Sequence, residues 1–331
     1  MLGRRNRLRV HVQESAGSVD VFRIDQAKCL AALAGHADLA EHIDLSFGRT
    51  ADDLEQALPS AEVLVVGNFD AKNLQQRAPN LRWIQSIFAG MEKLAPQVPD
   101  AIMLTNASGV HAPKAAEFAI GAMLMLNCDI PQFIEDKASM TWKPRFTPSI
   151  DGRTVAILGV GAMGIAVAQL AKRFGMTVLG VARSAGPRPG VDACFEPSRL
   201  SEVLPRADFV VITLPNTTDT RGMIGRRELD LLPKHAGIVS VGRAQVLDHE
   251  ALADKLAEGE LSGAFLDVFV QEPLPPTSVL WRTPRLVITP HCVVDDASSY
   301  VSRSLAVFFD NLRRYLNGDS LNNLVDQKLG Y

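Results

Sequence analysis

A glycine-rich turn between an apolar strand and a helix constrains the fold of this chain most. The strand is predicted over Thr154–Leu158 and the helix over Ile165–Phe174. In such a turn Gly159 permits the tight bend, Gly161 lets a pyrophosphate approach the backbone, and Gly164 lets the helix pack closely on the strand. Three glycines alone could simply form a turn. In this strand–turn–helix setting, the GxGxxG pattern predicts a dinucleotide-binding unit.

The phosphates of the dinucleotide are expected at the start of the helix, where backbone N–H groups are exposed. The predicted phosphate-binding residues are Gly159, Gly161, Ala162, Met163 and Gly164.

The end of the second strand, Thr177–Val181, indicates which dinucleotide is bound. An NAD-specific site normally has Asp or Glu at this position, to bind the ribose 2′-OH. Here Ala182 occupies it, and Arg183 and Ser184 follow. Arg183 could pair with a 2′-phosphate and Ser184 could donate a hydrogen bond to it; the alternative is a solvated surface arginine. We predict a preference for NADP(H), with NAD(H) as the second coenzyme.

Short β-prone runs alternate with helical patterns along the whole chain, which indicates mostly parallel sheets. The first hundred residues are expected to contain the strands Leu8–Val12, Ile43–Phe47, Glu62–Gly67, Leu81–Ile87 and Ala101–Thr105. A second series is expected at Thr154–Leu158, Thr177–Val181, Phe209–Leu214, Ile238–Val241, Gly263–Asp267 and Leu286–Thr289. With 331 residues, about two domains are expected. The predicted fold is α/β, with two doubly wound parallel-sheet domains.

Helices are expected between and after these strands. They include Thr50–Leu58, which opens with a threonine N-cap, and also Ala112–Leu126, Glu250–Glu258 and Ala297–Leu316. The proline-containing stretch Cys128–Ile150 is expected to be a linker or a surface arm.

Composition excludes several classes of protein. Lys and Arg number 34 against 37 Asp and Glu, so the net charge is −3, which argues against a nucleic-acid partner. The four cysteines form no CxxC pair, so neither a disulfide framework nor a metal site is expected. The basic N-terminus lacks an apolar segment behind it, and the apolar run Ala115–Leu126 is too short for a bilayer. We expect a cytoplasmic protein with reduced thiols and no membrane partner.

Arg243, Glu272 and His291 each follow a predicted strand. Ligands of doubly wound sheets bind at the carboxyl ends of strands, so these three side chains could face one crevice. Each has an ordinary alternative: a surface ion pair, a residue before a turn, or a capping histidine. Their joint occurrence after a dinucleotide fingerprint favours a functional site.

Several segments of the chain resemble those of a known family. The segments GRTVAILGVGAMG, LSEVLPRADFVVITLPNTTDTRGMIG, SVGRAQVLDHEAL, LDVFVQEPLP and LWRTPRLVITPH are similar to those of the D-isomer-specific 2-hydroxyacid dehydrogenases, in particular the glyoxylate/hydroxypyruvate reductase branch. The match runs from about Leu81 to His291, and the first 80 residues match only in pattern. The resemblance implies a flavodoxin-like substrate domain of residues 1–106 plus 296–331. It also implies a Rossmann cofactor domain of residues 107–295, with a cleft between the two.

The resemblance implies a role for each matched residue. Arg243 would bind the carboxylate and carbonyl of the substrate. His291 would be the general acid and, in the reverse direction, the base. Glu272 would orient His291 and favour its protonated form, because a nearby negative charge stabilises an imidazolium. Asp267 would contact the nicotinamide carboxamide.

Further residues are implied to contact substrate or cofactor. Backbone N–H groups of Ala89 and Gly90 would bind the substrate carboxylate, and Trp142 would reach the substrate pocket of a neighbouring subunit. The remaining cofactor-binding residues implied are Leu214, Pro215, Val241 and Gly242, the first two beside the adenosine. Ala112–Leu126 and the arm after it would form a homodimer interface. The expected partner is a small 2-keto or 2-hydroxy acid.

These residues predict NAD(P)H-dependent reduction of a small 2-keto acid to the D-2-hydroxy acid. One alternative is a dinucleotide-sensing scaffold, similar to a corepressor, which can retain the same three residues. A formate dehydrogenase-like enzyme is disfavoured, because that chemistry typically pairs its histidine with glutamine rather than with a residue like Glu272. The chain departs from the family after His291, where Cys292, Val293 and Val294 replace the usual small residues and glycine. This change bears on which acid is the substrate.

Overall fold

The chain forms two compact units in a computed structural model that describes residues 7–14 and 19–327. One unit contains residues 1–110 and 296–331, and the other contains residues 111–295. The basic start of the chain, residues 1–6, lies outside the described residues.

The first unit is built on a five-stranded parallel sheet of order β2-β1-β3-β4-β5. Its strands are β1 (Leu8–Gln13), β2 (Ile43–Gly48), β3 (Val63–Val66), β4 (Trp83–Ser86) and β5 (Met103–Thr105). Its helices are α1 (Gln26–Ala34), α2 (Ala37–Ala40), α3 (Ala51–Ala57), α4 (Leu74–Arg77) and α11 (Tyr300–Asn317). Thr50 caps α3 through a reciprocal capping box with Asp53, as its position before the helix predicts.

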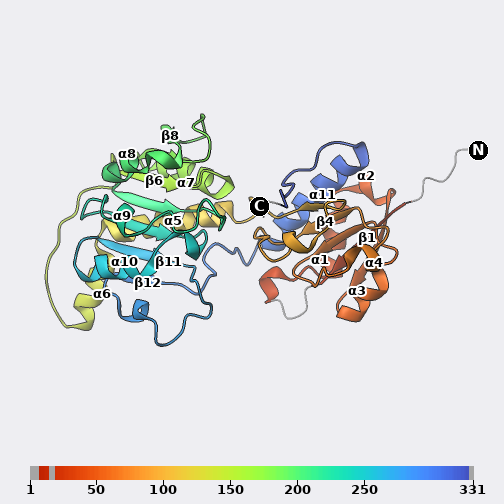
Figure 1. The fold of residues 1–331 in the computed structure, drawn as a ribbon, viewed down its shortest axis with the longest axis horizontal. Coiled ribbons are helices and arrows are strands. Elements are labelled where there is room, and N and C mark those ends of the chain that lie inside the picture. Colours follow the sequence, from red (N-terminus) through yellow and green to blue (C-terminus); the bar gives the residue numbers. More distant parts are fainter. Residues whose placement is uncertain (1–6, 15–18, 328–331) are drawn as a thin grey trace, which may run out of the picture. The chain divides into compact units, whose positions relative to one another are not determined.

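Alternate residues of each strand pack against helices on opposite faces of this sheet. Val63 and Val65 pack in a core cluster with residues of α1 and α11, whereas Leu64 and Val66 pack with residues of α3 and α4. In Figure 1, α11 from the end of the chain lies beside β1 and β4 from its beginning, and Phe308 of α11 stacks on Trp83. A parallel sheet covered on both faces is a doubly wound sheet.

The second unit is built on a seven-stranded parallel sheet of order β12-β11-β10-β9-β6-β7-β8. Its strands are β6 (Thr154–Leu158), β7 (Thr177–Val181), β8 (Ala193–Phe195), β9 (Phe209–Ile212), β10 (Gly237–Ser240), β11 (Gly263–Leu266) and β12 (Leu286–Ile288). Its helices are α5 (Ala112–Asn127), α6 (Ile130–Ala138), α7 (Ala162–Arg173), α8 (Leu200–Val203), α9 (Arg226–Leu229) and α10 (His249–Ala257). One face packs against α5 and α7, and the other packs against α8, α9 and α10. Together the two sheets confirm the predicted fold class.

Short 3₁₀ turns connect several of these elements. They are Asp20–Phe22, Ala95–Gln97, Pro197–Arg199, Leu204–Arg206, Ala244–Val246 and Val279–Arg282.

Three local features differ from the predictions. Helix α6 was not predicted within the stretch Cys128–Ile150. Pro131 falls in its first helical turn, where a missing N–H has no cost. The three-residue edge strand β8 was missed. Helix α7 begins at Ala162 instead of Ile165, so Gly164 lies inside its first turn.

The junction between the units lies four residues later than the sequence predicts. Residues 107–110 fall within the first unit. The physical reason is packing, since Ala107 and Val110 form a small buried cluster with Tyr300 at the start of α11.

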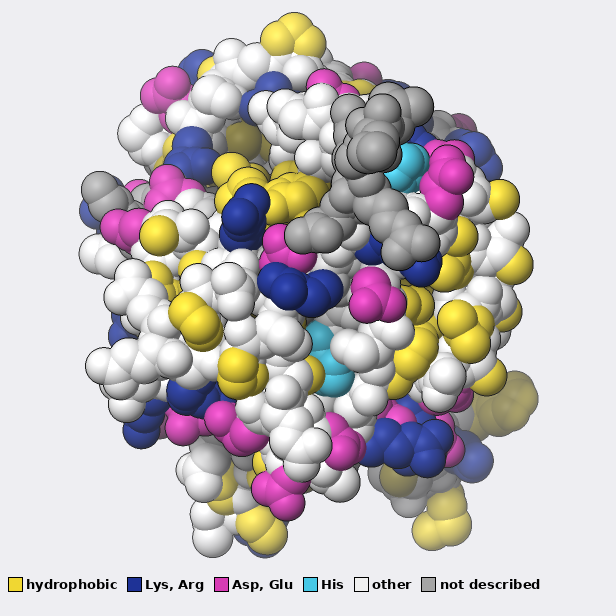
Figure 2. All heavy atoms as spheres, turned by 90° about the vertical axis from the view of Figure 1, so that its right-hand side faces the viewer, with side chains coloured by type: hydrophobic (Ala, Val, Ile, Leu, Met, Phe, Trp, Pro, Cys, Tyr) yellow, Lys and Arg dark blue, Asp and Glu magenta, His cyan; other side chains and the backbone are white. Residues whose placement is uncertain are grey.

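The surface shown in Figure 2 has basic and acidic side chains interspersed, in keeping with the nearly balanced charge of the chain. In the part of the chain that the structure describes, no helix is both long and apolar enough to cross a bilayer.

Candidate active site

The glycine turn after β6 has the backbone geometry that its sequence predicts. Gly159 adopts φ +98°, a conformation that residues with a Cβ rarely reach. A Cβ at Gly164 would lie 2.0 Å from the carbonyl oxygen of Gly159, so only glycine lets α7 begin this close to the strand. The loop after β9 secures the turn from the other side, where Thr213 Oγ1 donates a 2.6 Å hydrogen bond to the Gly159 carbonyl.

The start of α7 fits a phosphate group. Gly161 is the N-cap residue and offers no side chain to cap the helix. A Cβ built on Gly161 meets no protein atom within 4 Å, so space for a ligand is open there. The N–H groups of a first helical turn have no acceptor within the helix, and the helix dipole favours an anion at this end. The turn therefore fits the pyrophosphate of a dinucleotide.

The loops after β9 and β10 meet beside this turn. A Cβ on Gly242 would lie 2.6 Å from the carbonyl oxygen of Leu214, so the two loops touch through their backbones. Leu214 and Pro215 are half-buried, and Val241 is buried. Strands β6 and β9 are neighbours in the sheet but not in the sequence, and such a crossover is where doubly wound sheets bind ligands.

The end of β7 places two arginines in one loop. Ala182 donates its N–H to the Phe195 carbonyl of β8, and Arg183 and Ser184 follow as exposed residues. Arg188 donates a 3.1 Å hydrogen bond to the Ser184 hydroxyl. Arg188 is not among the residues predicted from the sequence. A second arginine in a loop without an acidic residue from 182 to 191 is the signal that could have found it.

Glu272 and His291 are in direct contact. Oε2 of Glu272 lies 2.8 Å from Nδ1 of His291, and Oε1 accepts a 2.8 Å hydrogen bond from the Phe269 N–H. Both carboxylate oxygens are therefore used, which fixes the imidazole at its Nδ1 edge. The Nε2 edge of the ring points away from Glu272, and the His291 side chain is 42% exposed.

The backbone around His291 is turned by a second carboxylate. His291 has φ +52°, a left-handed conformation that is uncommon for a residue with a Cβ. Asp267 Oδ1 accepts hydrogen bonds from the Cys292 N–H at 3.0 Å and the Thr289 hydroxyl at 2.7 Å. Val294, in the unusual turn after the histidine, is buried in the core shared with α5 and α7. The turn thus directs this branched side chain inward.

Asp267 is fully buried, and one of its two carboxylate oxygens accepts no hydrogen bond from a described residue. Its Oδ2 atom has no hydrogen-bond partner among the described residues. Burial raises the pKa of this carboxyl, against the opposing effect of its hydrogen bonds. A buried acceptor without a donor costs free energy in the folded state. The carboxamide N–H of a nicotinamide could donate a hydrogen bond to this oxygen. The second unit therefore fits a nicotinamide dinucleotide at both its phosphates and its carboxamide.

The other predicted residues lie in several places. Arg243 follows β10 and is half-buried, with Nη1 donating to the Gly242 carbonyl at 3.1 Å. Ala89 and Gly90 follow β4 in the first unit and are half-buried. Trp142 lies in the arm after α6 and is 96% exposed. His111, the N-cap residue of α5, has Nδ1 3.1 Å from Asp295 Oδ1.

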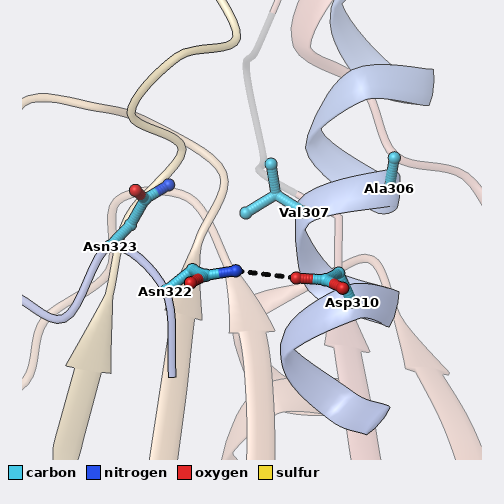
Figure 3. Close-up of a pocket in the computed structure, with 5 residues that line it drawn as sticks. All are labelled: Ala306, Val307, Asp310, Asn322 and Asn323. Atoms are coloured by element: carbon cyan, nitrogen blue, oxygen red, sulfur yellow. Dashed lines mark hydrogen bonds between the residues drawn. The ribbon is translucent and has the colours of Figure 1, made fainter. Parts of the chain in front are cut away.

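A hollow of about 420 Å³ in the first unit involves none of the predicted residues. Figure 3 shows its lining, which is Ala306, Val307, Asp310, Asn322 and Asn323. The Asn322 amide donates to the Asp310 carboxylate at 2.7 Å, so this acid already has a partner. Within residues 7–14 and 19–327, no group of three or more His, Cys, Asp or Glu side chains could hold a metal ion.

The second unit therefore combines a phosphate-binding turn, a buried acceptor and a carboxylate–histidine pair on one parallel sheet. Together they define a dinucleotide-dependent oxidoreductase. Residues 120–293 match the model of the D-isomer specific 2-hydroxyacid dehydrogenase, NAD binding domain. The chain belongs to the D-isomer specific 2-hydroxyacid dehydrogenase family, and it is an NAD(P)-dependent oxidoreductase.

Individual relatives agree over most of the chain. A glyoxylate reductase of Korarchaeum cryptofilum is 31% identical over 89% of this chain and 93% of its own length. The chain also matches a D-3-phosphoglycerate dehydrogenase of Methanocaldococcus jannaschii at 28% identity, but it spans only 55% of that protein.

Two solved structures are similar over nearly their full length. A D-isomer specific 2-hydroxyacid dehydrogenase of Xanthobacter autotrophicus, solved with NADPH and MES, gives a TM-score of 0.83 at 27% identity, covering 97% of this chain and 99% of that one. An NADPH-dependent glyoxylate/hydroxypyruvate reductase of Sinorhizobium meliloti, solved with NADP and sulfate, gives 0.80 at 26% identity, covering 98% and 100%.

Proposed function

We propose that this protein reduces a small 2-keto acid of the glyoxylate or hydroxypyruvate type to the D-2-hydroxy acid. The observation that supports this most directly is the contact between Glu272 and Nδ1 of His291, which leaves Nε2 as the proton donor. The names of the relatives support the substrate class. The scaffold hypothesis is not favoured, because these relatives are named as enzymes.

The substrate is bound by its carboxylate and oriented by its carbonyl. Arg243 pairs with both groups, because a guanidinium presents several donors in a fixed plane. Backbone N–H groups of Ala89 and Gly90 bind the carboxylate as well. The first unit, residues 1–110 plus 296–331, acts as the substrate domain, and the second unit, residues 111–295, acts as the cofactor domain.

The chemical step divides between the coenzyme and the chain. The bound coenzyme supplies a hydride to the keto carbon. His291 donates a proton from Nε2 to the carbonyl oxygen, where negative charge develops. Glu272 holds the ring in place through its contact with Nδ1. In the reverse direction His291 accepts the proton from the hydroxy acid.

The preferred coenzyme is NADP(H), and NAD(H) is the weaker alternative. Arg183 binds the 2′-phosphate, and Ser184 donates a hydrogen bond to it. Arg188 supports this assignment, because its guanidinium already contacts the Ser184 hydroxyl and adds a second positive charge to the loop. Carboxylate repulsion is absent from this stretch, since residues 182–191 include no Asp or Glu. The complexes of the similar structures with NADPH and NADP agree with this preference.

The deciding experiment follows absorbance at 340 nm with purified protein, glyoxylate or hydroxypyruvate, and either NADPH or NADH. We expect turnover that favours NADPH and is lost in His291→Ala. Turnover that favours NADH would overturn the coenzyme assignment alone. Dinucleotide binding without turnover of any 2-keto acid in a wider panel would overturn the proposed reaction.

We also propose that the protein is a homodimer. The arm after α6 exposes three large apolar side chains, Met140, Trp142 and Phe146, at 94–96% of their surface. Exposed apolar side chains on a segment anchored by Arg145 to Asp129 suit a protein partner. Trp142 then contributes to the substrate pocket of the neighbouring subunit. Light scattering after gel filtration tests the dimer, and a raised KM for the keto acid in Trp142→Ala tests the contribution of the tryptophan.

The cytoplasm is the proposed compartment. The four cysteines are all free thiols in the structure, which suits a reducing environment. Cell fractionation of the expressed protein tests this assignment.

A further inference from the structure

In the loop of residues 86–90, the carbonyl groups of residues 87–89 each accept a hydrogen bond from a residue outside the loop. The Ile87 carbonyl accepts a hydrogen bond from the Tyr300 hydroxyl at 2.8 Å, and the Phe88 carbonyl accepts one from the Ala107 N–H at 3.1 Å. The Ala89 carbonyl accepts one from the Asn106 side-chain amide at 2.9 Å. Each carbonyl of the loop from 87 to 89 thus has its own partner.

A trans peptide unit is planar, and its N–H points opposite to its C=O. The bond to the Phe88 carbonyl therefore sets the direction of the Ala89 N–H. The bond to the Ala89 carbonyl likewise sets the direction of the Gly90 N–H. These two N–H groups are the ones proposed above to bind the substrate carboxylate. The unit between Ile87 and Phe88 differs, because its N–H is already bonded to the Ser86 hydroxyl at 3.1 Å.

Asn106 is itself held rigidly. It is 6% exposed. Its side-chain oxygen accepts from the Ser108 N–H at 3.0 Å, and its backbone carbonyl accepts from the Gln85 amide at 3.2 Å. Its backbone N–H donates to the Asn323 carbonyl at 3.2 Å, and the Asn323 amide returns a bond to the Asn106 carbonyl.

Asn323, labelled in Figure 3, belongs to the segment that follows α11. The end of the chain therefore supports Asn106, and Asn106 supports the loop.

We propose that Asn106 is a positioning residue for substrate binding: its amide orients the Gly90 N–H toward the keto-acid carboxylate through the Ala89 carbonyl. This inference rests on the proposed function, because it requires a carboxylate substrate at the loop. A group that is preorganised to donate to a carboxylate loses no free energy to reorientation when the substrate binds. The effect falls on substrate affinity rather than on proton or hydride transfer.

The test compares Asn106→Ala with Tyr300→Phe. Asn106→Ala removes the hydrogen bond to the Ala89 carbonyl. The peptide unit between Ala89 and Gly90 can then rotate, so the direction of the Gly90 N–H is no longer fixed. Tyr300→Phe also removes one buried bond to the loop, but at the Ile87 carbonyl, whose peptide unit has its N–H bonded to Ser86. We expect Asn106→Ala to raise KM for the keto acid by about tenfold, the effect of one hydrogen bond to a charged group. We expect kcat and KM for NADPH to stay close to wild type, and Tyr300→Phe to leave all three constants close to wild type.

Several results would overturn the proposal. An unchanged keto-acid KM in Asn106→Ala would do so, as would an equal rise in Tyr300→Phe, because the effect would then be general loosening of the loop. Asn106→Ser provides a second variant if the alanine variant does not fold, and unfolding of both would make the role purely structural. If the wild type reduces no keto acid, the proposed function fails and this inference fails with it. If the wild type is active and His291→Ala is not, an unchanged KM in Asn106→Ala rejects the positioning role alone.

Discussion

His291 Nδ1 lies 2.8 Å from Glu272 Oε2, and the other oxygen of the same carboxylate is anchored by the Phe269 N–H. The histidine is thus oriented by a group that is itself fixed to the backbone three residues away. Glu272 therefore has an orienting role. His291 has the proton-transfer role, because its Nε2 atom is directed away from Glu272.

Glu272→Gln tests this separation. A glutamine can still accept from the Phe269 N–H, but its neutral amide makes a weaker hydrogen bond to His291 Nδ1 than a carboxylate does. We expect kcat to fall by about ten- to a hundredfold, and His291→Ala to lose more, because removal of a general acid costs about 10²–10⁴. Steady-state rates across the pH range measure both. Equal rates in wild type and Glu272→Gln would contradict the orienting role.

Substitutions of Gly164 and Gly161 separate an effect on stability from an effect on dinucleotide binding. A Cβ on Gly164 would meet the Gly159 carbonyl at 2.0 Å, whereas a Cβ on Gly161 meets nothing within 4 Å. We expect Gly164→Ala to lower the free energy of unfolding by about 1–3 kcal/mol, the usual cost of overpacking. We expect Gly161→Ala to keep nearly wild-type stability and to weaken dinucleotide binding. Urea denaturation and NADPH titration distinguish the two, and a reversed pattern would contradict the assignment of the turn.

Arg183→Ala tests the 2′-phosphate site without catalysis. Adenosine 2′,5′-bisphosphate and 5′-AMP differ only in the 2′-phosphate, and calorimetry can measure both. We expect the variant to lose about tenfold or more in affinity for the bisphosphate, because a charge-assisted contact is removed. Its affinity for 5′-AMP should not change. Arg282→Ala, which removes an exposed arginine elsewhere in the same unit, is the control for net charge. Equal losses in both variants would point to nonspecific electrostatics.

Asp267→Asn separates stability from coenzyme binding. The amide oxygen can keep the bonds from Thr289 and Cys292, while the amide nitrogen replaces the unpartnered Oδ2 atom. Because burial raises the pKa of this carboxyl, loss of the charge should leave the melting temperature equal or higher. Affinity for NADPH should fall by about tenfold, since a donor would then face a donor. Unchanged affinity would remove Asp267 from the coenzyme site.

His249 makes stability depend on pH. Burial lowers the pKa of this imidazole to about 4, from an ordinary value of 6.5. The unfolded chain therefore binds more protons between pH 6.5 and 4, and this contribution to stability is complete above pH 6.5 and lost as the pH falls. We expect about 2 kcal/mol of the loss between pH 7 and 5 to come from His249. Urea denaturation of His249→Leu should show a smaller drop than wild type, and an equal drop would contradict the assignment.

Strands that form continuous apolar runs could be predicted from the sequence, whereas the edge strand β8 and helix α6 could not. Strands β6 and β7 match their predicted limits, because buried parallel strands are continuous apolar runs. The edge strand β8 has only three residues, too few to show a period. Helix α6 was missed because its region contains several prolines, and Pro131 is compatible with a helix only by virtue of its first-turn position.

Some residues of the candidate site could be predicted from a sequence motif, and others could not. Glu272 and His291 stand 19 residues apart, and their pairing follows from the neighbouring strands β11 and β12, so a motif can indicate it. The contacts of Arg188 and Asn106 depend on how a loop closes. Their partners are a hydroxyl and a backbone carbonyl, which no sequence pattern specifies.

The split of the first unit into residues 1–110 and 296–331 fixes the order in which the chain can finish folding during synthesis. The core of the second unit draws only on residues within 111–295 and is complete before the last segment emerges. The core around Trp83 needs Phe308 and Phe309, which follow the second unit in the sequence. Part of one face of the five-stranded sheet therefore stays uncovered on the ribosome until α11 has emerged. During that interval, the nascent protein presents an apolar surface of the kind that chaperones bind.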